Sequence, residues 1–153
     1  MSKGDRRSFV PVLIKPLAQQ QWRRDITDRP LLNVVDPTLS LSLQCRQPRP
    51  FVTLMHRLRL NVAFTPRCKN KIGYSDSSLC SQCGVTADTE HVLINCDLYG
   101  TERRTVSAEL ARISNKPLSL AVVLGPCDSL AQHRQILRLL LVFLTATGLL
   151  RTL

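Results

Sequence analysis

Residues 80–96 read CSQCGVTADTEHVLINC, which is the pattern Cys-x2-Cys-x7-His-x4-Cys. Three thiolates and one imidazole fill the four tetrahedral positions that zinc takes in structural sites. A Cys-x2-Cys turn directs two thiolates at one metal, and Gly84 permits the sharp reversal that follows. Asp88 or Thr89 can cap a short helix that carries the histidine inward. The sequence therefore predicts one structural Zn2+ ion in a knuckle spanning residues 79–97, bound by Cys80, Cys83, His91 and Cys96.

The cysteines also admit other interpretations. The chain has six of them, enough for three disulfides, and the four knuckle residues can be ordinary core residues whose spacing arose by chance. However, residues 1–7 are polar and basic and do not resemble a secretory signal. The pattern therefore favours reduced thiols in an intracellular protein, nuclear or cytoplasmic and not secreted. No role is assigned to Cys45, Cys68 and Cys127.

The charge of the chain indicates a polyanionic partner. The 153 residues include 21 Lys and Arg against 11 Asp and Glu, a formal net charge of +10, and no acidic residue lies between Asp36 and Asp76. Nucleic acid, RNA or DNA, is the commonest partner of such a surface, although a basic protein with solvated arginines has the same composition. The residues predicted to contact phosphates are Arg57, Arg59, Arg67, Lys69, Lys71, Arg103 and Arg104.

Hydrophobic spacing predicts a mainly α fold, with four to five helices around the knuckle and little or no sheet. Hydrophobic residues make up 44% of the chain but aromatic residues only 5%, so we expect a core built mostly of Leu and Val. Three regions are expected: a flexible basic tail over 1–12, a helix plus a proline-rich connector over 13–50, and a helical domain over 51–153 that contains the knuckle.

Residues 51–64 have the clearest helical pattern. Leu54, Leu58 and Val62 recur at i, i+4 and i+8, which places them on one face of a helix. Pro66 is expected to stop this helix, because proline lacks the N–H that the next turn needs.

Weaker signals outline the neighbouring elements. Residues 67–74 are expected to form a turn in which Gly73 acts as a helix cap. Leu and Ser alternate over 39–43, as they do in a short strand. A further helix is predicted over 98–115.

The last helix is expected to begin after Asp128 or Ser129 and to run to about residue 147. It is apolar nearly all round over 139–144, so we expect it to be largely buried. The apolar stretch 136–150 is alternatively an interface for self-association or for docking on another domain. It is shorter than the roughly 20 residues of a membrane-spanning helix, so no membrane partner is predicted.

The residues that metal-dependent phosphoryl transfer requires are missing. Such enzymes cluster carboxylates around two metal ions, whereas this chain has three glutamates and eight scattered aspartates. No phosphate-binding glycine loop, nucleophile elbow or His-Glu-x-x-His motif occurs. A zinc site with four protein ligands leaves no position for a reactive water. We therefore expect that the chain is not an enzyme.

A family resemblance is carried by several short stretches. These are LMHRLRLN at 54–61, Lys71-Ile72-Gly73, the knuckle with Glu90-His91-Val92-Leu93, Tyr99-x3-Arg103, and FL-x2-TGL at 143–149. Together they resemble the C-terminal tail of non-LTR retrotransposon polyproteins, including copies abundant in tick genomes. In that family an RNase H-like domain is followed by a helical segment and a zinc-binding knuckle. The resemblance covers roughly residues 15–153.

The resemblance implies the same four zinc ligands and a retroelement-derived fragment that is separated from its enzymes. It implies that the acids of the reverse transcriptase and RNase H lie upstream of residue 1, and that the knuckle helps to hold element RNA or target DNA. The alternative is a structural or protein-interaction remnant, or a non-functional transposon fragment, without nucleic-acid binding.

Overall fold

The computed structural model describes residues 6–39 and 47–153, and the side chains among them from residue 14 onward. Its helices are α1 (Arg6–Asp25), α2 (Pro30–Val35), α3 (Arg49–Arg59), α4 (Pro66–Lys71), α5 (Gly100–Ile113), α6 (Leu120–Leu124), α7 (Leu130–Ala146) and α8 (Leu149–Thr152). A π-helical turn (His91–Asn95) and a 3-10 turn (Asp97–Tyr99) precede α5. Within the described residues the only β pairing is an isolated bridge between Leu79 and Thr86.

The predicted mainly α fold with little or no sheet is confirmed. The helices outnumber the expected four to five because α2, α4, α6 and α8 have only four to six residues each. Elements of one turn or slightly more carry too little periodic pattern to be recognised from spacing.

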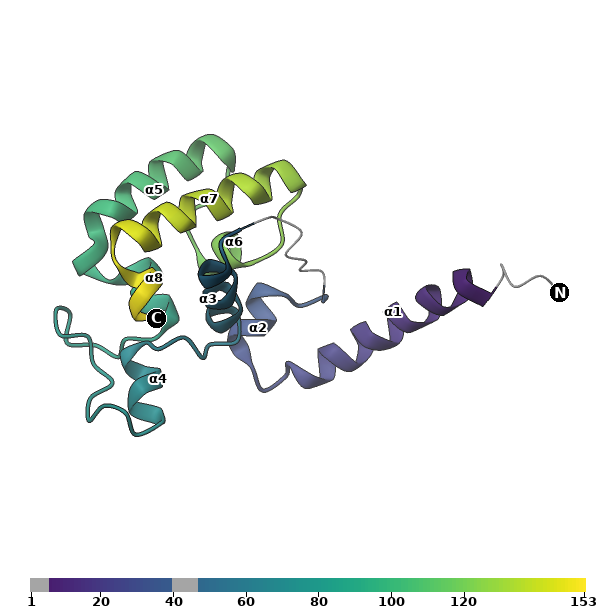
Figure 1. Ribbon diagram of the computed structural model, residues 1–153, viewed down its shortest axis with the longest axis horizontal. Helices are drawn as coiled ribbons and strands as arrows, with labels where there is room; N and C mark the ends of the chain where they lie inside the picture. The colour runs from purple at the N-terminus through teal and green to yellow at the C-terminus, as the bar shows by residue number, and fades with distance from the viewer. Residues whose placement is uncertain (1–5, 40–46) are drawn as a thin grey trace.

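Helix α3 lies at the centre of the fold. Figure 1 shows α1 projecting from a body formed by the other helices, in which α5 packs against α7 and α3 contacts α2, α6 and α8. The buried side of α3 consists of Phe51, Leu54, Met55 and Leu58, each at most 3% exposed. Burial of one such side chain stabilises a fold by about 1.5–3 kcal/mol. This face therefore anchors the helices around it.

The helix predicted over 51–64 is shorter than expected. It ends at Arg59, with Leu60 as its C-cap, because Asn61 takes a left-handed backbone conformation with φ 58° that reverses the chain. Val62 consequently falls outside the helix and is 50% exposed, so its predicted place on the buried stripe was wrong.

The residues expected to form only a turn after Pro66 form helix α4. Thr65 caps it by accepting a hydrogen bond from the Cys68 N–H at 3.3 Å, and Pro66 occupies its first turn, where no N–H is needed. The predicted cap at Gly73 is confirmed, because this residue follows the helix with φ 74°.

The first helix begins earlier than the sequence indicated. Helix α1 starts at Arg6, so the predicted flexible tail over 1–12 is helical from residue 6 onward, and residues 1–5 lie outside the described part of the chain. Pro11 and Pro16 lie inside the helix. A proline fixes φ at a value that fits a helix and removes a single N–H donor, so it does not by itself reverse the chain.

Two hydrogen bonds join α1 to the segment that follows α2. Trp22 Nε1 donates to the Asp36 carbonyl at 2.7 Å, and Gln19 Nε2 donates to the Thr38 carbonyl at 3.1 Å. Residues 40–43 of the strand-like run predicted over 39–43 lie outside the described residues.

The two long helices of the C-terminal half follow the sequence prediction closely. The helix expected over 98–115 is the 3-10 turn followed by α5, and α7 begins where Ser129 Oγ accepts a hydrogen bond from the Gln132 N–H at 3.2 Å. Helix α7 ends at Ala146. Its buried apolar residues are Ile136, Leu137, Leu140, Phe143 and Leu144, whereas Leu130 is 47% and Val142 64% exposed. In the described part of the chain, no helix is both long enough and apolar enough to cross a membrane.

Buried His133 in α7 makes stability depend on pH. Burial, and then the charge of Arg59, lower the pKa of His133 below its usual value near 6.5. The unfolded chain therefore binds a proton at this histidine more readily than the folded chain does. The folded state consequently loses stability as the pH falls below about 6.5 toward the lowered pKa. When the pH falls from neutral to below the pKa of free histidine, we expect the unfolding free energy of His133→Leu to decrease less than that of the wild type.

Urea unfolding of both proteins at each pH measures this difference. Protonation of the knuckle thiols affects both proteins equally and cancels in the comparison. Parallel pH profiles for the two proteins would contradict the prediction.

Candidate metal centre

The first half of the knuckle is a tight turn closed by backbone hydrogen bonds. The Cys80 N–H donates to the Val85 carbonyl at 2.8 Å, and the Gly84 N–H donates back to the Cys80 carbonyl at 2.9 Å. Gly84 has φ 69°, a conformation that side chains other than glycine's rarely adopt, and it makes the reversal that the sequence predicted. The turn brings Cys80 and Cys83 to the same side of the knuckle.

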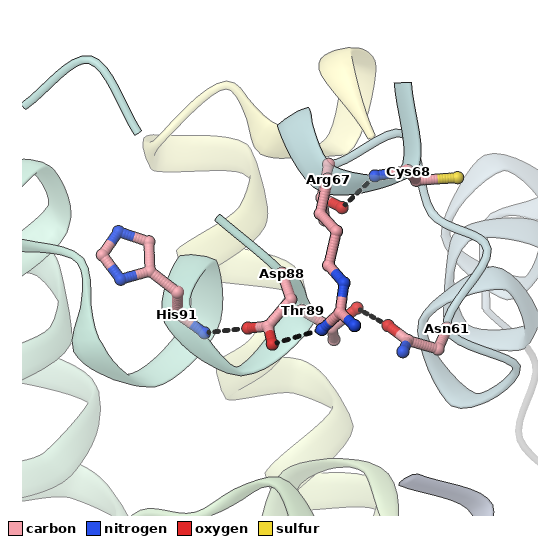
Figure 2. Close-up of polar contacts among 7 residues, drawn as sticks. Asn61, Arg67, Cys68, Asp88, Thr89 and His91 are labelled. Carbon is pink, nitrogen blue, oxygen red and sulfur yellow. Dashed lines mark hydrogen bonds and ion pairs between the residues drawn. The ribbon is translucent and has the colours of Figure 1, made fainter. Parts of the chain in front are cut away.

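The second half is a helical turn capped by Asp88. Its Oδ1 accepts a hydrogen bond from the His91 N–H at 2.9 Å, and its Oδ2 pairs with Arg67 Nη1 at 3.3 Å (Figure 2). The Cys96 N–H donates to the His91 carbonyl at 2.7 Å, which is the i+5 spacing of a π turn. The cap predicted at Asp88 or Thr89 is thus made by Asp88.

Thr89 holds the knuckle against the end of α3. Its hydroxyl donates to Asn61 Oδ1 at 2.9 Å, as Figure 2 shows, and the side chain is 1% exposed. The knuckle is therefore joined to α4 through Asp88 and Arg67, and to α3 through Thr89 and Asn61.

Four potential ligand atoms converge at the centre of the knuckle. One atom each from Cys80, Cys83, His91 and Cys96 lies within 4.8 Å of all the others. The Cys96 sulfur is 3.6 Å from that of Cys80 and 3.9 Å from that of Cys83. Thiolates placed tetrahedrally at about 2.3 Å from one zinc ion are about 3.8 Å apart. These residues lie close enough to hold a metal ion.

The imidazole of His91 supports the same conclusion. The residue is 8% exposed, and its Nε2 atom is buried without a hydrogen-bond partner among the described residues. An unpartnered buried nitrogen is costly for a fold, and a bound metal ion relieves that cost when the nitrogen is its ligand.

The pKa values of two thiols of the cluster, Cys80 and Cys96, are shifted in opposite directions. Burial raises the pKa of the Cys80 thiol, but hydrogen bonds from the Cys83 and Gln82 backbone, together with the neighbouring His91 and Cys96 side chains, outweigh it and lower the pKa to about 6. Burial, assisted by hydrogen bonds with the Cys80 and Cys83 sulfurs, raises the pKa of Cys96 to about 11. A metal ion binds thiolates, so its entry displaces a proton from Cys96.

Arg103 holds the backbone next to the cluster through hydrogen bonds, a role that the sequence did not reveal. Its Nε donates to the Leu93 carbonyl at 3.1 Å and its Nη2 to the Cys96 carbonyl at 2.6 Å. The Leu93 carbonyl lies in the π turn, and the Cys96 carbonyl just beyond it also accepts a hydrogen bond from the Tyr99 N–H at 3.3 Å. The guanidinium that was predicted to contact phosphates is thus engaged in positioning a ligand.

Removing Arg103 should weaken metal binding. We expect Arg103→Ala to lower zinc affinity about 10-fold, at the lower end of what outer-shell partners of metal ligands contribute, because Cys96 loses its anchor. Competition with a coloured zinc chelator measures the affinity, and Arg104→Ala, which removes an exposed neighbour on α5, is the matched control. Equal affinities of the two variants would contradict this role.

Arg59, which was also predicted to contact phosphates, is buried. It is 6% exposed, and its Nε donates to the Leu124 carbonyl at 2.8 Å. Burial lowers its pKa, and the nearby Asp36 acts in the opposite direction. The prediction that Arg59 contacts phosphates was wrong, because the helix turns this residue into the core.

The other predicted basic residues remain accessible. Arg57, Arg67, Lys71 and Arg104 are exposed, and Lys69 is half-buried. The Arg57 guanidinium lies over the Phe64 ring, 5.3 Å from its centroid, and Arg67 pairs with Asp88.

Among the described residues, the cysteines outside the knuckle do not belong to the ligand cluster. Cys68 and Cys127 are half-buried free thiols, and Cys45 lies outside the described residues. In the part of the chain that the structure describes, the knuckle is the one group of three or more His, Cys, Asp or Glu side chains that could hold a metal ion.

Comparison with known proteins found no match: no family model, no curated protein and no solved structure resembles the chain at a significant level. The retroelement resemblance therefore stays a prediction, carried by the stretches of sequence quoted for it.

Proposed function

We propose that the metal is a single zinc ion with a structural role. Three sulfurs and one nitrogen are the ligand set of structural zinc sites, and four protein ligands leave no open position for substrate or water. The observation that carries the proposal is the convergence of these four side chains, three of them at most 9% exposed. Zinc would fix the segment between α4 and α5 to the helices on either side.

We further propose that the helices around the knuckle form a non-catalytic module that contacts nucleic acid through basic residues on α3, α4 and α5. The accessible basic residues are Arg57, Arg67, Lys69, Lys71 and Arg104, a set revised by leaving out Arg59 and Arg103. The net charge of +10 favours a polyanion, and the resemblance to the zinc-knuckle tail of non-LTR retrotransposons is consistent with element RNA or target DNA as the partner.

Salt dependence tests the nucleic-acid contact. If five basic residues each displace a counterion from a single strand, the dissociation constant should rise about 100-fold between about 50 and 200 mM salt. Fluorescence anisotropy of a labelled oligonucleotide measures this with the zinc-loaded chain. Binding that does not change over this range, or no binding at micromolar protein, would contradict the proposal.

A further inference from the structure

Helix α4 ends in a rigid turn that presents side chains to solvent. The Gly73 N–H donates to the Asn70 carbonyl at 3.0 Å, and the Tyr74 N–H donates to the Lys69 carbonyl at 2.8 Å. These are the two bonds of a Schellman motif. Asn70 Nδ2 also donates to the Ser75 carbonyl at 2.9 Å. The backbone on both sides of Tyr74 is therefore fixed by local hydrogen bonds.

Two large side chains of this turn are exposed to solvent. Tyr74 is 79% exposed and Ile72 is 60% exposed. In a Schellman motif the residue at the Tyr74 position often packs back on the third-last helical residue, which here is Lys69. At 79% exposure, most of the aromatic surface of Tyr74 is left in water, where it contributes little to stability.

Basic residues precede this exposed ring in the chain. Lys69 and Lys71 lie in the last turn of α4, and Arg67 lies in its first turn. No acidic residue occurs from residue 37 to residue 75, and exposed Asp76 is the first beyond that stretch. Figure 1 places α4 at the edge of the molecule, away from α5 and α7. A long polyanion can therefore reach the turn without crossing the helical body.

We infer that Tyr74, with Lys69 and Lys71, is a stacking platform for single-stranded nucleic acid. An exposed aromatic ring on a fixed turn offers a face for one base, and the two lysines, three and five residues earlier in the chain, offer charges for the adjacent phosphates. A duplex hides its base faces, so the platform discriminates against it. Stacking on one ring reads no base edges, so binding is tolerant of sequence. The inference rests on the nucleic-acid binding proposed above and identifies its substrate class.

The test compares two probes on the zinc-loaded full chain: a labelled oligothymidylate of about 16 nucleotides and a duplex of equal length. The wild type should bind the single strand more tightly. Tyr74→Ala should weaken single-strand binding between about 5-fold and 150-fold, the range measured for loss of one base–aromatic stack, and should leave duplex binding unchanged. Tyr74→Phe should bind as the wild type does, because the ring is kept.

Two controls accompany these variants. Val142→Ala removes another exposed apolar side chain, on α7, and should change neither affinity. The double substitution Lys69→Gln and Lys71→Gln should weaken binding of both probes and reduce the salt slope for the single strand by about 1.4. Each variant is first checked for unchanged zinc content.

The outcomes separate the two levels of the proposal. If the wild type binds neither probe, nucleic-acid binding itself fails and the platform fails with it. If the wild type binds but Tyr74→Ala binds the single strand equally well, only the platform is overturned, and the exposed turn is assigned to a protein partner instead. An unchanged salt slope in the double variant also overturns the platform.

Discussion

Replacing Cys96 by serine is expected to abolish zinc binding and to unfold the knuckle. Cys96 is 2% exposed, and its sulfur lies 3.6 Å from that of Cys80 and 3.9 Å from that of Cys83, so its loss removes one of the three thiolates of the cluster. Zinc contributes on the order of 10 kcal/mol to the folding of isolated zinc-finger peptides. Since a whole domain is stable by only about 5–15 kcal/mol, the loss should be comparable with the total.

The effect should spread beyond the knuckle. Val92 and Leu93 follow the ligand His91 and are 6% and 3% exposed within the same core as α3 and α7. Without the metal these side chains lose their position, so we expect a lower melting temperature as well as a loss of zinc. Elemental analysis and circular dichroism measure both.

Cys68→Ser is the matched control for this experiment. Cys68 is a half-buried free thiol on α4 that is not part of the cluster, so its variant should keep one zinc per chain. A Cys96→Ser protein that retains a full equivalent of zinc would refute the ligand assignment.

Leu58→Ala is expected to destabilise the fold by about 2–5 kcal/mol, the range measured for leucine truncation in well-packed cores. Leu58 is 0% exposed on α3, which contacts α2, α6 and α8, so the lost methyl groups leave a cavity that several helices would have to fill. Urea unfolding measures the change in unfolding free energy.

Leu60→Ala provides the comparison within the same segment. Leu60 lies two residues further on, at the C-cap of α3, and is 45% exposed. Truncation there should cost less than about 1 kcal/mol, because such a side chain is already largely in water. Similar losses for the two variants would contradict the central position of α3.

The parts of the fold that the sequence predicted are those specified by local signals. The cysteine spacing, Gly84 in its left-handed turn, the Asp88 cap and the Ser129 cap each depend on residues within a few positions of one another. Such patterns are fixed by local backbone chemistry and do not require knowledge of the neighbouring helices.

The errors concern residues whose environment is set by distant parts of the chain. Arg59 resembled a surface arginine because its buried acceptor, the Leu124 carbonyl, lies 65 positions away. The structural role of Arg103 was missed because the Leu93 and Cys96 carbonyls that it holds are positioned by the π turn and the 3-10 turn after it. The end of α3 depends on Asn61 adopting a left-handed conformation, for which the sequence carried no glycine as a signal.

X-ray absorption spectroscopy at the zinc edge tests the central claim most directly. If Cys80, Cys83, His91 and Cys96 bind one structural zinc ion, the purified chain should contain one zinc per molecule. Its nearest shell should consist of three sulfurs at about 2.3 Å and one nitrogen at about 2.0–2.1 Å. A shell with fewer sulfurs and an oxygen from water, or a chain that binds no zinc, would contradict the account.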